Sequence, residues 1–262
     1  MERWKLFAKG LMLLALVRLV EWYPALFDGL GSQSKTVPLW QDYNSWFEPS
    51  DLWLTDGFVY SILGLYVALL TWQFFKPNVV GLILVGAIQF QLHLVLYFFV
   101  TMADNWRMLC LWYAIAGLFF CQYKQEHWVK RTFVGHLMLF YWVSVWHKLS
   151  YPDWQGGYAL ARIAWHPYWG ESFPAFFAGT IFTYTTMALE LLFPITWLFK
   201  STRKWGVFAG VFFHTVLMLF IPVVGFSLIM MWSLFMVLNE KEWLDIKKAL
   251  RMQRFFRKGY RY

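Results

Sequence analysis

Charged residues are scarce in this sequence, and cysteine is almost absent. Only 15% of the 262 residues are charged, whereas soluble domains have about 25%. The two cysteines, Cys110 and Cys121, fall in one expected helix. Their spacing places them about 16 Å apart along that helix, which is too far for a disulfide bond. These shortages exclude a disulfide scaffold and argue against a tandem of soluble domains.

Metal-ligand spacing is also missing. The six histidines, at positions 93, 127, 136, 147, 166 and 214, form no H-x-x-x-H pair. Zinc sites depend on clustered ligands of that kind, so we expect no metal. Nucleic-acid binding is not expected either, because eight of the cations behind the net charge of +8 lie in residues 241–262.

Long apolar runs dominate what remains. A membrane-spanning helix needs about 20 apolar residues, and eight runs approach that length: Phe7–Phe27, Gly57–Phe75, Val79–Met102, Met108–Tyr123, Thr132–Leu149, Phe176–Phe199, Trp205–Ile221 and Val223–Leu238. We therefore predict an all-α, polytopic transmembrane bundle of about eight helices over residues 1–240. The last two runs are short, so one of them is expected to be re-entrant or covered by its neighbours. Ala103–Asn105 is read as a short connection between two of the helices.

Cations are distributed unevenly between the two sets of alternating connections. One set, which includes both termini, has 18 lysines and arginines, and the other has only Lys35, Arg107 and Arg162. Cytoplasmic loops of membrane proteins are enriched in such residues. The pattern predicts a protein of the inner or plasma membrane with both termini in the cytoplasm. The acidic loop over residues 28–56 is then outside.

Three further segments have distinctive compositions. Residues 241–262 alternate cations with Trp, Leu and Phe, which is typical of an amphipathic helix on an anionic membrane surface. A solvated tail is the alternative. The two long outer connections, over residues 28–56 and 150–174, are rich in aromatic residues, and we expect both to fold over the outer end of the bundle.

Several ionisable residues fall inside the predicted helices, where charge is costly and therefore often functional. Glu190 has no cation nearby in sequence, so it needs a distant partner such as Arg18, a histidine or Lys148, or it stays protonated. His214 is either a helix–helix hydrogen-bond partner or a catalytic group. Lys148 ends its helix on the outer side, where it either reaches the headgroups or turns inward as a base.

The segment around Lys148 resembles the horizontally transferred transmembrane (HTTM) family, which includes the membrane domain of the vitamin K-dependent gamma-carboxylase. The resemblance is based on His147-Lys148-Leu149, Asp153-Trp154 and Gly156-Gly157, with supporting pieces at Leu14–Arg18, Leu191–Pro194, Thr202–Trp205, Phe213-His214 and Gly225–Ser227. Together these pieces cover residues 7–240.

The resemblance implies an enzyme with a reduced, vitamin K-like quinone as its cofactor. Lys148 would be the base, with His214 and Asn105 as further catalytic residues. Residues in contact with the cofactor would be Trp146, His147, Trp154 and Glu190. The product would be a modified, carboxylated secreted peptide.

Two other functions stay open. Trp106 stands where the carboxylase has a histidine after the asparagine, and a basic tail stands where the carboxylase has a peptide-binding domain. A non-catalytic maturation or assembly factor for a secreted peptide or toxin is therefore the main alternative. A transporter is less well supported, because the sequence shows neither repeated halves nor paired broken helices.

Overall fold

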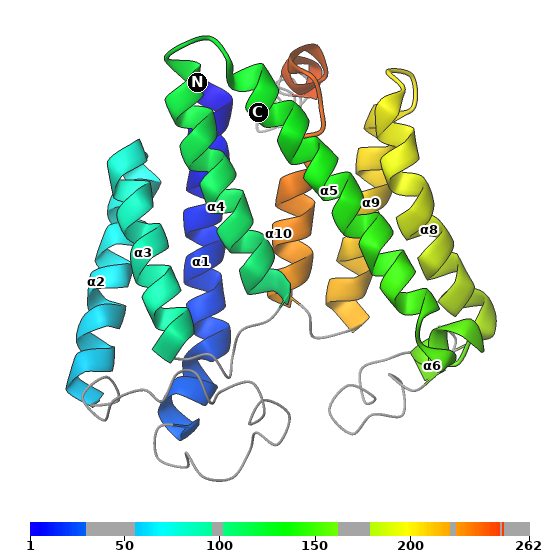
Figure 1. The fold of residues 1–262 in the computed structure, drawn as a ribbon, viewed down its shortest axis with the longest axis horizontal. Helices are drawn as coiled ribbons and strands as arrows, with labels where there is room; N and C mark the ends of the chain where they lie inside the picture. Colours follow the sequence, from blue (N-terminus) through cyan, green and yellow to red (C-terminus); the bar gives the residue numbers. More distant parts are fainter. Residues whose placement is uncertain (30–55, 96–101, 162–178, 221–223, 247, 249–262) are drawn as a thin grey trace, which may run out of the picture. The chain divides into compact units, whose positions relative to one another are not determined.

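The computed structural model describes residues 1–29, 56–95, 102–161, 179–220, 224–246 and 248 (Figure 1). Every regular element in these ranges is a helix, which confirms the all-α class. The chain divides into two compact units, Met1–Phe133 and Val134–Tyr262. The sequence predicts a different division, with one domain over residues 1–240 and a tail. The two units are described separately.

The first unit is an antiparallel group of helices (Figure 1). Its elements are α1 (Glu2–Gly29), α2 (Asp56–Phe75), α3 (Val79–Val95), α4 (Met102–Cys121) and the beginning of α5 (Glu126–Leu149). α1 packs against α2 and α4, and α3 packs against the same two helices. Because successive helices reverse direction, the N-terminus, the α2–α3 turn and the α4–α5 turn lie at one end of this unit.

A close approach between α1 and α4 organises the core of the first unit. Trp4 is 2% exposed, and a Cβ atom added to Gly117 would lie 2.1 Å from the indole atom Cδ2. Phe7 continues the contact, with its ring 6.0 Å from Trp4 and 5.4 Å from Phe133. Gly117 is therefore needed for the indole to pack flat against α4.

Arg107 corrects the charge assignment made from the sequence. It is 4% exposed inside the first unit and does not lie in an outer connection. With the Gln89 amide turned so that both neighbours are satisfied, its oxygen accepts from Arg107 Nε and Nη2 at 3.2 Å, and its nitrogen donates to the Tyr66 hydroxyl at 3.1 Å. These polar partners on α2 and α3 compensate for the loss of water around the guanidinium group. The predicted connection Ala103–Asn105 is accordingly part of the first turn of α4.

The second unit contains the rest of α5, followed by α6 (Pro152–Gln155), α8 (Thr180–Leu198), α9 (Arg203–Phe220) and α10 (Val224–Leu234). α9 packs against α8 on one side and α10 on the other. α10 has 11 residues, about 16 Å of helix, and ends four residues before the predicted Leu238. The turn over residues 235–237 ends it, with Met236 N bonded to Ser233 O at 3.0 Å.

A capping box marks where the predicted tail begins. Glu242 N donates to Asn239 Oδ1 at 2.8 Å, and Asn239 N donates to Glu242 Oε2 at 2.6 Å. This reciprocal pair starts a helix over residues 240–246. The remainder of the predicted amphipathic tail, and the acidic connection over residues 30–55, lie outside the described residues.

Both units have an apolar core that also contains a few polar side chains, and both expose many large apolar side chains. Buried polar side chains are Gln73, Gln89, Arg107, Thr183, Glu190, His214, Ser227 and Ser233. Large apolar side chains are exposed along most helices, for example Phe212 on α9 at 71% and Ile181 on α8 at 77%. By length and composition, Thr180–Leu198 is the one described helix that is long and apolar enough to cross a membrane, and four shorter helices are also apolar.

We expect Gly117→Ala to lower the thermal unfolding midpoint of the purified protein in detergent. The new methyl group would collide with the Trp4 ring, and overpacking of this kind costs about 1–3 kcal/mol. Gly64→Ala in α2 is the matched control, because nothing lies within 4 Å of its added Cβ atom. There the higher helix propensity of alanine should leave the midpoint unchanged or raise it. Equal midpoints for both variants would contradict the close contact.

Candidate functional site

α5 presents three polar side chains on one face. Tyr141, Ser144 and Lys148 are spaced i, i+3 and i+7, so they follow one another along the same side of the helix. The helix places Glu126 in its first turn and His147 and Lys148 in its last. This order of charges complements the helix dipole. The cationic end of α5 is therefore a favourable position for a protonated lysine.

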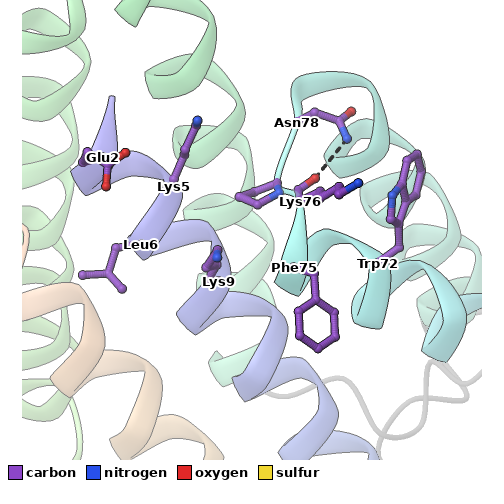
Figure 2. Close-up of a pocket in the computed structure, with 9 residues that line it drawn as sticks. Glu2, Lys5, Leu6, Lys9, Trp72, Phe75, Lys76 and Asn78 are labelled. Carbon is purple, nitrogen blue, oxygen red and sulfur yellow. Dashed lines mark hydrogen bonds between the residues drawn. The ribbon is translucent and has the colours of Figure 1, made fainter.

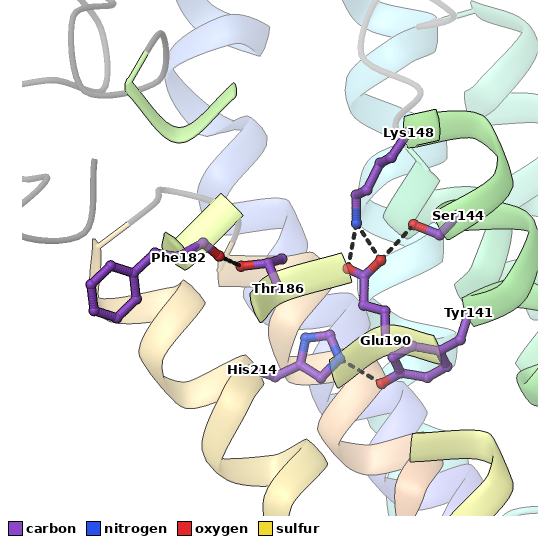
Figure 3. A network of polar contacts seen from close by, with 7 residues as sticks. All are labelled: Tyr141, Ser144, Lys148, Phe182, Thr186, Glu190 and His214. Atoms are coloured by element: carbon purple, nitrogen blue, oxygen red, sulfur yellow. Dashed lines mark hydrogen bonds and ion pairs between the residues drawn. The ribbon is translucent and has the colours of Figure 1, made fainter. Parts of the chain in front are cut away.

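Lys148 and Glu190 form an ion pair between α5 and α8 (Figure 3). The ammonium group contacts both carboxylate oxygens, and Ser144 Oγ donates to Oε2 at 3.2 Å. The two side chains are 18% and 9% exposed. Of the partners that the sequence left open for Glu190, the described residues bring Lys148 to it. The carboxylate thus has three hydrogen bonds from α5 in a largely apolar setting.

A second polar pair lies about two turns before Lys148 along α5. The Tyr141 hydroxyl and His214 Nε2 are 2.7 Å apart, and both residues are buried (Figure 3). Aromatic rings surround them: Phe193, Trp197, Phe213 and Phe226. The other imidazole nitrogen, Nδ1, is buried and has no hydrogen-bond partner in the described part of the chain.

The backbone of α8 is interrupted next to Glu190. Pro194 lies inside this helix and has no N–H to donate to the carbonyl four residues earlier, which is that of Glu190. The neighbouring carbonyl of Leu191 accepts a hydrogen bond from Trp142 Nε1 at 3.3 Å. α5 is therefore attached to α8 by this indole as well as by the ion pair.

The chain after α5 folds against the N-terminal part of α8. The Tyr184 hydroxyl donates to Gln155 O at 2.6 Å, and Gly157 has φ of 77°. A Cβ atom on Gly157 would lie 2.2 Å from Thr180 Cγ2, so both the backbone angle and the contact require glycine. This turn holds the Trp154 ring 5.0 Å from Lys148 Nζ, in a cation–π contact.

Three of the predicted site residues are in direct contact, and a fourth is nearby. Lys148 touches both Glu190 and Trp154. His214 belongs to the neighbouring tyrosine–histidine pair. The sequence did not assign roles to Tyr141 or Ser144, although their spacing from Lys148 on one helical face was a usable signal.

The other predicted residues lie elsewhere. Trp146 is 75% exposed on α5. His147 is also exposed, and its Nε2 is 3.3 Å from the Tyr151 hydroxyl. Asn105 is exposed in α4 of the first unit, so its catalytic role stays a prediction. Among the described residues, no group of three His, Cys, Asp or Glu side chains is arranged to hold a metal ion.

Proton exchange is the chemistry that this arrangement can perform. An amine and a carboxylate in direct contact can exchange a proton, and an adjacent hydroxyl and imidazole supply further donors and acceptors. The apolar surroundings strengthen each of these interactions. Comparisons with protein-family models, curated proteins and solved structures find no match to this chain.

We expect Glu190→Leu to destabilise the protein by on the order of 2 kcal/mol, because it leaves the Lys148 charge without its partner. The double variant Lys148→Met/Glu190→Leu should recover most of that loss, since neither charge remains. The free energy of unfolding, measured by circular dichroism in mixed detergent, tests both. Lys200→Met, an exposed lysine at the other end of α8, is the control and should have little effect. Additive losses in the double variant would argue against a coupled pair.

Proposed function

We propose that this protein is an HTTM-like integral membrane enzyme in which Lys148 acts as a base on a quinol-like lipid, coupled to modification of a secreted peptide. The observation that carries the proposal is the Lys148–Glu190 pair, set between helices with apolar outer surfaces. Ionisable groups in such positions are costly and are functional hypotheses by default. The resemblance around Lys148-Leu149 and Asp153-Trp154 supports the same reading.

The exposed apolar side chains support the membrane part of the proposal. α9 exposes Trp205, Phe208, Phe212 and Leu219 while His214 on the same helix is buried. In water, an apolar surface of this size promotes aggregation, whereas in a bilayer it faces lipid. α8 is long enough to span the hydrocarbon region, and we propose that the other long helices of the bundle cross with it.

Each unit has several lysines or arginines at one end. In the first unit, Lys5, Lys9 and Lys76 line one cavity beside the α2–α3 turn. In the second, Arg203 Nη1 lies 3.9 Å from Glu242 Oε2, which brings the α8–α9 turn beside the basic segment over 241–248. The positive-inside rule favours a cytoplasmic location for these ends. Lys148 then lies toward the outer face.

The ion pair can provide the base in two proton states. In the charged state the ammonium group of Lys148 donates to the Glu190 carboxylate. In the neutral state that proton has moved to Glu190, and the free amine of Lys148 can accept another proton from a nearby hydroxyl while Glu190 keeps its own. Ser144 Oγ, which donates to Glu190 Oε2 at 3.2 Å, would help to hold the carboxyl group in place.

The residues around the pair suit a reduced quinone. The Trp154 ring lies beside the amine and offers a flat apolar surface, and the unpartnered Nδ1 of His214 offers a polar contact in the buried interior. When bound, a reduced quinone supplies an acidic ring hydroxyl and a reservoir of electrons. Lys148 would hold its hydroxyl proton, and Trp154 would orient the ring.

A non-catalytic maturation or assembly factor for a secreted peptide is the second candidate. The observation in its favour is that Lys148, Glu190, Ser144 and Tyr141 all have partners within the second unit. A fully paired network of this kind can serve only to fix α5 against α8 and α9.

Lys148→Arg should separate the two functions. Arginine keeps the positive charge and the ion pair, so the variant should fold, but it cannot lose a proton to act as a base. With molecular oxygen as the oxidant, we expect quinol oxidation by the purified protein to fall by about 10²–10⁴-fold, the usual contribution of a general base. Secreted peptides from cells with this variant should lack the mass of one added carboxyl group.

Lys200→Arg is the matched control and should keep full activity. A folded, active Lys148→Arg protein would remove Lys148 from catalysis. Peptides that are processed normally without any carboxyl mass in the unsubstituted strain would favour the maturation factor.

Two introduced cysteines should report the proposed orientation. Ser150 and Ser201 are exposed at opposite ends of the second unit, separated by the 19 residues of α8, about 28 Å of helix. In a background with Cys110 and Cys121 replaced by alanine, a membrane-impermeant maleimide should label Ser150→Cys in intact cells. It should label Ser201→Cys only after the cells are permeabilised. Equal labelling of both sites in intact cells would contradict a spanning α8.

A further inference from the structure

A cavity of about 600 Å³ lies in the first unit between the first turns of α1 and the α2–α3 turn (Figure 2). It is distinct from the Lys148 cluster, since all its lining residues fall within residues 2–78. Lys5 and Lys9 come from α1, and Lys76 comes from the turn.

The cavity has an excess of positive charge. Three lysines and one carboxylate, Glu2, line it, so its formal charge is 3 − 1 = +2. Lys5 and Lys9 are half-buried and one helical turn apart, a spacing at which like charges repel. Among the described residues, none of the three lysines forms an ion pair. An anion bound between them would relieve this repulsion.

The wall of the cavity is held in place by its own hydrogen bonds. Asn78 caps α3, with Gly81 N donating to its Oδ1 at 2.8 Å. Asn78 N donates to Gln73 Oε1 at 2.9 Å, and Asn78 Nδ2 donates to the carbonyl of Lys76 at 3.2 Å (Figure 2). Pro77 restricts the same turn. The position of the Lys76 backbone is therefore set before any ligand binds.

Aromatic rings flank the cationic centre. Trp72 and Phe75 line the cavity and are 49% and 67% exposed. A free inorganic anion would gain nothing from such rings. A phospholipid places an anionic phosphate beside glycerol and acyl chains, and indole rings are favoured at that boundary. The combination of lysines and exposed rings therefore favours a lipid over a soluble phosphate compound.

We propose that this cavity binds the phosphate group of an anionic phospholipid, with Lys5, Lys9 and Lys76 as its ligands and Trp72 beside the upper acyl chains. Basic pockets between membrane helices on the cytoplasmic side recognise such headgroups. The inference rests on the proposed membrane location and orientation. It does not depend on whether Lys148 is a base.

Isothermal titration calorimetry tests the proposal. It measures the binding of short-chain lipids to the purified protein in neutral detergent. The probes are dioctanoyl phosphatidylglycerol, dioctanoyl phosphatidylcholine, glycerol 3-phosphate and inorganic phosphate. We expect phosphatidylglycerol to bind most tightly. The triple variant Lys5→Gln/Lys9→Gln/Lys76→Gln should weaken its binding by at least about tenfold, because each lysine near the headgroup contributes to the attraction.

The matched control is Lys200→Gln/Lys204→Gln/Lys241→Gln, which removes the same charge from exposed positions outside the cavity and should change the affinity by less than about twofold. If the triple variant of the cavity lysines fails to fold, Lys9→Gln alone should still weaken the binding of phosphatidylglycerol. An equal loss in the control triple, or equal affinity for phosphatidylcholine or for glycerol 3-phosphate, would overturn the proposal. Lys148→Ala should bind phosphatidylglycerol normally. A failure of the lipid-binding proposal is therefore distinguishable from a failure of the proposed enzyme activity.

Discussion

Lys148 and Glu190 place opposite charges between two helices whose outward surfaces are apolar, and the second unit is arranged around that constraint. Each charge removed from water costs several kcal/mol unless a partner and further hydrogen bonds compensate. Ser144 supplies one such bond, and the Trp154 ring covers the ammonium group. The turn at Gly157 and the indole of Trp142 keep α5 and α8 in register, so that the compensation is complete.

The helices were predictable because their signal is local. Each of the eight apolar runs overlaps one described helix, because an α-helix forms its backbone hydrogen bonds within the segment itself. The ends of the helices were harder to predict from the sequence. Asp104 and Asn105 looked like a connection but lie in the first turn of α4, where residues of this type are favoured. Apolar Met236 and Val237 looked helical but form the turn after α10.

The site was predictable only in part, because its contacts are distant in sequence. The isolation of Glu190 among leucines showed that it needed a partner from another helix, but nothing local distinguished Lys148 from Arg18 or a histidine. The same limit explains Arg107. Its position near a helix end suggested an outer connection, and only the packing of α3 and α4 brings it to Gln89. A count of the lysines and arginines in each connection does not take such a partner into account.

Pro194 gives α8 a mechanical property that its neighbours lack. A helix that lacks one backbone hydrogen bond bends more easily at that point than elsewhere. The hydrogen bond that is missing in α8 would have been accepted by the Glu190 carbonyl. The N-terminal half of α8, which bears Tyr184 and the contact with residue 155, can therefore tilt as a lever about the acid. A force applied to that half would reach the Lys148–Glu190 ion pair without any molecule touching either side chain.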